Sequence, residues 1–364
     1  MMVHSFHLRI VPIFFKLQFL VPYLVSGETI HPNDFWLPGD VVPVHYDLSL
    51  QVNMENFTTE GEVSIEVDVV KNTKQFTLHV HPKIVTVKQS EVKVCQLFGS
   101  FACVSVEDHE LDEEKQFYTI KLADFISNDL AAGAKVKLVI PFKGFIRGGR
   151  NATNATKWEN LKLGLYKSKD DLGGSMAVTQ LESMNARSVF PCFDEPRLKS
   201  TFILKLGRTK EYRTRANTVA QKEGEELAGK PGYLWDTYTI TPKMSTYLLA
   251  FAVFNATIKS SDSTSGRGVK VQAFYANASS MEHAAVVCAK MLDYFEQNVF
   301  VGINYSLPKM DIIAVPQFPG AMENWGMVTF HTSLSLYSES GRDERTVDND
   351  NIMGHEVVNL SSYI

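Results

Sequence analysis

The chain has 364 residues, 45% of them hydrophobic, and a formal net charge of −5. This length and apolar content allow about two domains with cores of their own. The negative charge and the absence of a lysine- or arginine-rich cluster argue against a nucleic acid as partner.

The amino-terminal segment, residues 1–27, resembles a secretory signal. Basic residues precede an apolar run over 17–25, and the small residues at 26–27 offer a cleavage site. Lys16 and Pro22 interrupt the apolar character, so a membrane span of ~20 residues is the weaker interpretation. We therefore expect a signal peptide here, with a signal anchor that holds the protein on a membrane as the alternative.

Seven N-x-S/T sequons follow this segment and predict N-linked glycans. They begin at Asn56, Asn151, Asn154, Asn255, Asn277, Asn304 and Asn359. Several sequons behind an apolar leader favour a glycoprotein of the secretory pathway that is extracellular or lies at the cell surface.

The four cysteines match no zinc-ribbon spacing. Cys95 and Cys103 lie on either side of a turn at Gly99. They can form a disulfide or remain two unpaired thiols, and both alternatives stay open at this point.

Apolar and polar residues alternate with period two from about residue 41 to 145. The pattern is clearest over 44–52, 63–69 and 136–140. Such alternation predicts half-buried antiparallel strands. A second strand-rich stretch covers about 175–254.

We interpret two groups of polar residues in this region as structural rather than as metal-binding or catalytic residues. His79 and His81 fall on one face of a predicted strand, and we expect them to face solvent rather than to bind a metal. Asp194-Glu195-Pro196 is expected to form a structural turn rather than a catalytic pair of carboxylates.

Beyond residue 255 the spacing of apolar residues changes to that of a helix. Cys288, Met291 and Phe295 fall on the apolar side, where we expect Cys288 to belong to the core rather than to react. The chain is therefore predicted to divide into a β-domain over 34–255 and a mixed α/β segment over 256–364.

The stretch Gly320–Gly326 is the first of two segments that contain candidate functional residues. An apolar run over 310–316, predicted to be a strand, leads into it. Gly320 and Ala321 place almost no side chain beside the backbone, so the main chain of a ligand can lie along this edge. Glu323 puts a carboxylate at the same edge.

Five motifs in chain order make the sequence resemble the zinc aminopeptidases of the aminopeptidase N family, the gluzincin exopeptidases. They are Pro43-x-His45-Tyr46-Asp47-Leu48, Thr179-Gln180-Leu181-Glu182, Phe190-Pro191-Cys192-Phe193-Asp194-Glu195-Pro196, Met244-Ser245-Thr246-Tyr247-Leu248 and Gly320–Gly326. The resemblance implies a mainly β amino-terminal saddle domain followed by the incomplete first part of a thermolysin-like α+β catalytic domain.

The resemblance also implies a substrate, a peptide with a free N-terminus. In this family the Glu of Gly-Ala-Met-Glu-Asn binds the α-amine, which points here to Glu323, and the acidic residue of the second motif, Glu182, supplies a second carboxylate. An α-ammonium with a pKa near ~8 is largely charged at neutral pH, and paired carboxylates recognise it. The other residues expected to contact the peptide are Gln180, Gly320, Ala321, Met322 and Asn324.

The second segment, around His355-Glu356, departs from the family's zinc site. Two histidines at i and i+4 of a helix bind one zinc, and the Glu between them activates the bound water. His355 matches the first ligand and Glu356 the general base, but Asn359 stands at the second position, where a neutral amide is a poor zinc donor. The family's third ligand, a further Glu, would lie beyond Ile364.

Three interpretations are compatible with these residues. The chain is a truncated and inactive form of a zinc aminopeptidase, a secreted non-catalytic β-domain that binds peptides or proteins, or an adhesion module whose motifs are structural leftovers. We favour the first, because the match continues as far as His355-Glu356 and stops within a few residues.

Overall fold

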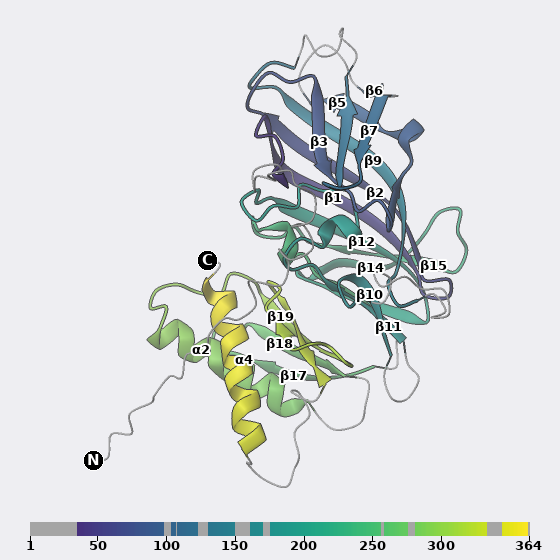
Figure 1. Ribbon diagram of the computed structural model, residues 1–364. Helices are drawn as coiled ribbons and strands as arrows, with labels where there is room; N and C mark the ends of the chain where they lie inside the picture. Colours follow the sequence, from purple (N-terminus) through teal and green to yellow (C-terminus); the bar gives the residue numbers. More distant parts are fainter. Residues whose placement is uncertain are drawn as a thin grey trace, which may run out of the picture. The chain divides into compact units, whose positions relative to one another are not determined.

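The computed structural model covers the chain with gaps. It describes residues 35–97, 103–106, 108–122, 130–149, 161–169, 175–255, 258–275, 281–332 and 344–362. The predicted leader and the sequons at Asn151, Asn154 and Asn277 lie outside the described residues. From Leu37 onward the chain forms one compact unit, in which β-strands are the main regular structure (Figure 1). Among the described residues, no helix has the length and apolar character needed to span a membrane.

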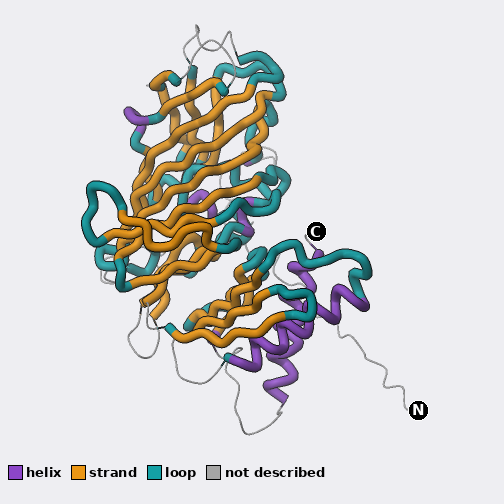
Figure 2. Tube along the Cα trace, turned by 180° about the vertical axis from the view of Figure 1, so that it is seen from behind, coloured by secondary structure: helices purple, strands orange, loops and turns teal. Residues whose placement is uncertain are grey.

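Strands from the alternating stretch over 41–145 and from the second strand-rich stretch together form a nine-stranded sheet (Figure 2). Across the sheet lie β14 (Ala220–Glu226), β15 (Tyr233–Tyr238), β12 (Thr201–Thr209), β1 (Val41–Asn53), β2 (Thr58–Val69), β9 (Lys135–Phe145), β5 (Lys93–Gln96) and β6 (Val104–Ser105), with β4 (Val85–Val87) also paired to β9. β1 and β2 run antiparallel with Leu48 opposite Val63, as the alternation predicts. β12 joins β1 in parallel, which the alternation does not predict.

Two smaller sheets complete the β-rich part. The four-stranded sheet orders β10 (Gly164–Lys169), β11 (Ser175–Gln180), β16 (Phe251–Asn255) and β13 (Tyr212–Ala216). The three-stranded sheet orders β3 (Gln75–His79), β8 (Phe117–Lys121) and β7 (Asp108–Asp112). β11 is buried along almost its whole length and ends at Gln180, so Glu182 follows directly from a rigid strand.

The remaining residues form a mixed α/β part around a five-stranded sheet. Its order is β17 (Lys259–Thr264), β18 (Lys270–Tyr275), β19 (Lys309–Val315), β21 (Met327–His331) and β20 (Ala321–Met322). Helix α2 (Glu282–Asn298) packs on β17 and β18 and against helix α4 (Glu344–Ser362) (Figure 1). The prediction of a mainly β part followed by a mixed part is therefore confirmed.

Two of the cysteines form a disulfide, and the other two are buried free thiols. Cys95 and Cys103 form a disulfide, which settles the two alternatives left open by the sequence. Cys192 and Cys288 are free thiols and both are buried. Cys288 lies in the core as predicted, 1% exposed.

The prediction that His79 and His81 face solvent was wrong. The two residues are 1% and 9% exposed, because a segment more than a hundred residues later covers them. The backbone N–H of Asp194 donates to His79 Nδ1 at 3.2 Å. Burial, and then the charge of Arg187, lowers the pKa of His79 to about 2. Burial, and then Arg147, lowers the pKa of His81 to about 4.

The Asp194-Glu195-Pro196 motif is structural, as predicted. Asp194 is buried, and its Oδ2 accepts from Arg187 Nε at 3.0 Å. A Glu195 carboxylate oxygen accepts from the backbone N–H of Leu37. The motif thus ties neighbouring segments of the β-rich part together.

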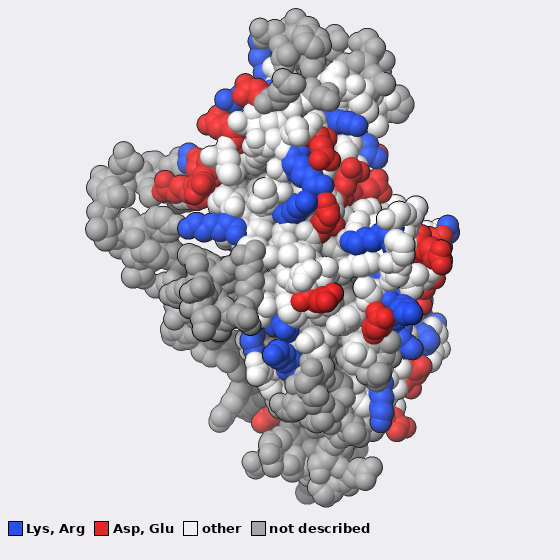
Figure 3. All heavy atoms as spheres, turned by 90° about the vertical axis from the view of Figure 1, so that its right-hand side faces the viewer, with Lys and Arg blue, Asp and Glu red and all other residues white. Residues whose placement is uncertain are grey.

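The described surface mixes both signs of charge. On the face shown in Figure 3, lysine and arginine side chains lie among aspartate and glutamate side chains. Lys135 on β9 pairs with Asp68 on the adjacent β2, and Lys88, just after β4, pairs with Glu60 on β2, both at 2.7 Å. Such partly exposed pairs contribute little to stability, typically about 0–1 kcal/mol.

The buried histidines predict a loss of stability in acid. In the unfolded chain a histidine takes up a proton as the pH falls below about 6.5, whereas the fold keeps His79 and His81 neutral. Their contribution is complete above that pH and is lost as the pH falls towards the folded pKa values, by up to about 1.4 kcal/mol per pH unit and histidine. His79→Asn and His81→Asn should flatten this dependence. Urea midpoints between pH 7.5 and 4.5 measure it, and an unchanged slope in both variants would contradict the account.

Candidate functional site

Three glutamates from three separate segments meet in one place. Glu182 follows β11, Glu323 follows β20, and Glu356 lies on α4, which contacts β20. Glu356 is 5% exposed, Glu323 is half-buried and Glu182 is exposed. We call this group the carboxylate cluster.

The three carboxyl groups influence one another's ionisation. Burial, followed by the charge of Glu323, a hydrogen bond with Glu323 and the charge of Glu182, raises the pKa of Glu356 to about 8. Burial, followed by the charge of Glu323, also raises the pKa of Glu182. The raised pKa favours the protonated form of Glu356 at neutral pH, in which its hydroxyl donates a hydrogen bond to the Glu323 carboxylate. A cation placed among these groups would favour their ionised forms instead.

Two of the predicted site residues have a buried acceptor without a partner in the described part of the chain. Glu356 Oε2 and Gln180 Oε1 have no hydrogen-bond partner among the described residues, although both atoms are buried. Unsatisfied buried polar atoms are rare in native proteins, and a bound ligand is one way to satisfy them. The two atoms call for a donor, which a cationic N–H group can supply.

The strand that leads to Glu323 lies at the edge of the five-stranded sheet. β20 pairs with β21 alone, Ala321 opposite Phe330 and Met322 opposite Thr329. A Cβ at Gly320 would meet no atom within 4 Å, so the backbone there is open. An extended peptide can add to such an edge through main-chain hydrogen bonds.

The five residues of the Gly-Ala-Met-Glu-Asn stretch differ in exposure. Gly320, Ala321 and Glu323 are partly exposed, whereas Met322 and Asn324 are each 1% exposed. Met322 packs in the hydrophobic core. The accessible part of this edge thus consists of backbone, two small residues and one carboxylate.

His355 and Asn359 lie one turn apart on the same side of α4. Asn359 Nδ2 lies 3.1 Å from His355 Nε2 and 3.4 Å from Glu323 Oε1. The amide therefore presents its N–H donors both to the imidazole and to the carboxylate. In this orientation the amide turns its N–H donors towards the site, and its neutral oxygen is a poor zinc donor.

The donor set does not fit a catalytic zinc. Such sites take three protein ligands drawn from imidazoles, thiolates and carboxylates. His355 is the one imidazole on this side of α4, and the neighbouring position is held by the Asn359 amide. Within the described ranges, no three His, Cys, Asp or Glu side chains gather as a metal site would require.

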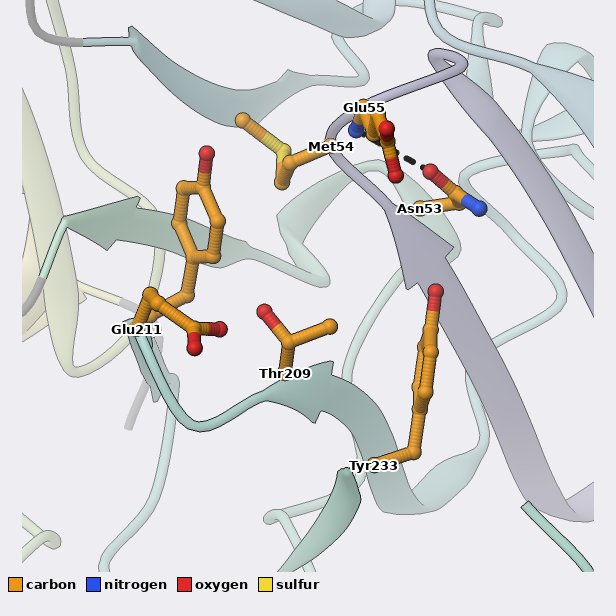
Figure 4. A pocket seen from close by; sticks show the side chains of 7 residues that line it. Asn53, Met54, Glu55, Thr209, Glu211 and Tyr233 are labelled. Atoms are coloured by element: carbon orange, nitrogen blue, oxygen red, sulfur yellow. Dashed lines mark hydrogen bonds between the residues drawn. The ribbon is translucent and has the colours of Figure 1, made fainter. Parts of the chain in front are cut away.

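A cavity of about 340 Å³ lies apart from the cluster (Figure 4). Its lining residues are Asn53, Met54, Glu55, Thr209, Glu211, Tyr212 and Tyr233. Glu55 and Glu211 are exposed, and the Glu55 backbone N–H donates to Asn53 Oδ1 at 3.0 Å. None of the predicted site residues lines this cavity. It lies between the turn that joins β1 to β2, the turn that joins β12 to β13, and the start of β15.

Sequence reasoning missed two buried residues that bond the backbone just after Glu323, at the Gly326 carbonyl. Lys309 and Asp311 on β19 are 6% and 1% exposed and pair at 2.7 Å. A lysine and an aspartate inside a predicted buried strand were the available signal, since unpaired charges are excluded from such strands. Asn217, whose Nδ2 donates to Trp325 O at 2.9 Å, was missed as well, and it gave no comparable signal in the sequence.

Comparison with known proteins finds two family matches along the chain. Residues 42–248 match the Peptidase M1 N-terminal domain, and residues 283–359 match the Peptidase family M1 domain. Together the two matches extend from β1 to the Asn359 turn of α4.

Curated relatives carry aminopeptidase names. Glutamyl aminopeptidase of Rattus norvegicus is 33% identical over 351 residues, which cover 92% of this chain and 33% of the relative. Aminopeptidase 2, mitochondrial, of Saccharomyces cerevisiae is 34% identical over 319 residues, 87% of this chain and 30% of the relative. Endoplasmic reticulum aminopeptidase 1 of Rattus norvegicus is 28% identical over 319 residues. The chain thus spans about a third of the length of these relatives.

Two glycines at the ends of the Glu323 stretch should respond differently to alanine. Gly326 has φ +86°, and a Cβ there would lie 2.0 Å from Asn217 O, so Gly326→Ala should cost roughly 1–3 kcal/mol or more. Gly320 has open space, so Gly320→Ala should leave the melting temperature nearly unchanged. Thermal unfolding of the two variants checks this. Equal losses, or a stable Gly326→Ala, would show that the turn is not packed as described.

Proposed function

Because this chain belongs to peptidase family M1, we propose that its carboxylate cluster is the site of an aminopeptidase for the free amino terminus of a peptide. The observation that carries the proposal is the meeting of Glu182, Glu323 and Glu356 beside an open strand edge. The relatives named above are aminopeptidases by name, and such enzymes act at the amino terminus.

The chemistry of an α-ammonium suits this cluster. It carries a positive charge at neutral pH and three N–H donors. Glu323 and Glu182 offer negative charge, and Glu356 Oε2 and Gln180 Oε1 are buried acceptors in need of donors. The peptide backbone that follows the amine can then extend beside Gly320 and Ala321 at the edge of β20.

We further propose that these 364 residues bind the terminus without cleaving it. In a zinc peptidase the metal supplies an activated water, and a Glu takes its proton. Here the Asn359 amide lies beside His355 and Glu323 at the position of the second ligand, where a neutral amide is a poor zinc donor. The proposal therefore assigns Glu356 to the binding of cations, with no hydrolytic step.

The proposal includes the cellular setting predicted from the sequence. A disulfide between Cys95 and Cys103 supports an oxidising compartment, as the leader and sequons do. Asn56 and Asn304 are exposed and accessible to N-glycans. The division into a β-domain over 34–255 and a mixed part over 256–364 belongs to the same proposal.

The test compares one peptide with and without a free amine. A pentaalanine peptide with a carboxy-terminal fluorophore should bind more tightly than its N-acetylated form. Glu323→Gln keeps the shape but removes a charge-assisted hydrogen bond worth about 1.5–3 kcal/mol, so the Kd for the free peptide should rise roughly ten- to a hundredfold. Fluorescence anisotropy at pH 7 measures binding, and mass spectrometry should recover the peptide intact.

Glu60→Gln is the matched control. Glu60 is a partly exposed glutamate on β2 that pairs with Lys88 and belongs to no predicted site. It should leave both Kd values unchanged. Equal binding of the two peptides by the wild-type chain would overturn the proposed function. If Glu323→Gln keeps the preference for the free amine, the anchor lies elsewhere, and Glu182 is the next residue to replace.

A further inference from the structure

We propose that Asn217 and Lys309 are positioning residues for the Glu323 carboxylate. Their side chains, here called the Asn217–Lys309 clamp, hold two consecutive backbone carbonyls, those of Trp325 and Gly326, just after Glu323. Neither residue belongs to the carboxylate cluster. The inference deepens the proposed function and rests on it for the ligand that Glu323 would bind.

Asn217 joins the β-rich part to the turn after Glu323. It follows β13 and is 1% exposed. Its Nδ2 donates to Trp325 O at 2.9 Å and to Leu248 O at 2.8 Å, and its Oδ1 accepts from the Ala250 N–H at 2.7 Å. Both N–H donors and the carbonyl oxygen are thus in use. The position of Trp325 is fixed against a segment about seventy residues earlier.

Lys309 makes the second half of the clamp. Its buried Nζ donates to Gly326 O at 2.9 Å, to Asp311 Oδ2 at 2.7 Å and to Ala216 O at 2.5 Å, which uses all three N–H donors. The backbone N–H of Asp311 donates to the same Gly326 carbonyl at 3.0 Å. Ala216 precedes Asn217, so both halves of the clamp connect the same two segments.

The turn itself leaves little freedom between the clamp and Glu323. The Met327 N–H donates to Asn324 O at 2.9 Å and closes a turn over 324–327. Gly326 sits at φ +86° against the backbone oxygen of Asn217. β20, on the other side of Glu323, pairs through only two residues. The short strand cannot by itself fix the carboxylate, so the clamp provides the second point of attachment.

A buried ion pair elsewhere in the β-rich part separates positioning from general stability. Arg208 is 9% exposed and bonds Asp236 through two nitrogens, one of them at 2.9 Å, without touching the Glu323 stretch. Thr241 is likewise buried and bonds the backbone of Phe202 at 2.9 Å. Changes at these two places remove comparable interactions and serve as matched controls.

The experiment measures selectivity rather than stability alone. Selectivity is the ratio of the Kd of N-acetylated to that of free pentaalanine peptide, read by fluorescence anisotropy on the full chain. Asn217→Leu, and Lys309→Met combined with Asp311→Asn, should lower this ratio roughly tenfold, as expected when a charge-assisted hydrogen bond loses its geometry. Thr241→Val, and Arg208→Met combined with Asp236→Asn, should lower the melting temperature but keep the ratio. Should Asn217→Leu fail to fold, Asn217→Ala replaces it.

Amide hydrogen exchange of residues 321–327 gives a readout independent of any ligand. Exchange there should quicken in both clamp variants and stay as in the wild type in both controls. If the wild-type chain shows no preference for the free amine, the proposed function fails and the exchange data alone decide on the clamp. Clamp variants that keep the selectivity ratio, or that leave the exchange of 321–327 unchanged, would overturn the inference.

Discussion

Crowding of like charges is the constraint on which this site depends. Two carboxyl groups in contact and shielded from water cannot both ionise without a large cost. The pKa of Glu356 is raised to about 8, which favours its protonated form, and Asn359 donates to Glu323 from one turn further along α4. Without a ligand, the proton on Glu356 and the N–H donor of Asn359 offset the negative charge that a ligand's cationic group would otherwise balance. In the proposed function, an ammonium ion takes the place of this proton and of the neutral amide donor.

The surrounding fold keeps the crowded groups together. β11 delivers Glu182 from the end of a buried strand, and α4, packed on α2, delivers the buried Glu356. Glu323 has the weakest local support, a two-residue edge strand, and the buried Asn217 and Lys309 side chains reinforce it. Placing a functional carboxylate on an open edge leaves room for a peptide backbone. Because the edge strand is short, contacts with residues distant in the sequence must hold the carboxylate in place.

The sequence predicted those features whose cause is local. Alternation located β1 and β2, the apolar run located β19, and helical spacing located α2. His79 and His81 were misjudged because alternation assigns residues to a face but does not say what covers it. Glu182 and Glu323 were chosen through the resemblance of their motifs, since nothing in their spacing shows that they meet. The hydrogen bond from Asn217 to Trp325 joins residues about a hundred positions apart, and the sequence pattern could not predict it.

Proton release on binding tests the central claim most directly. At pH 7 the carboxyl of Glu356, with a pKa of about 8, is mostly protonated. An ammonium bound in the cluster favours ionisation, so calorimetric titration of pentaalanine peptide in buffers of different ionisation enthalpy should show release of close to one proton per peptide. Glu356→Gln should abolish the release. Tight binding of the free peptide with no proton released at pH 7 would contradict the account, because the amine would then lie outside the carboxylate cluster.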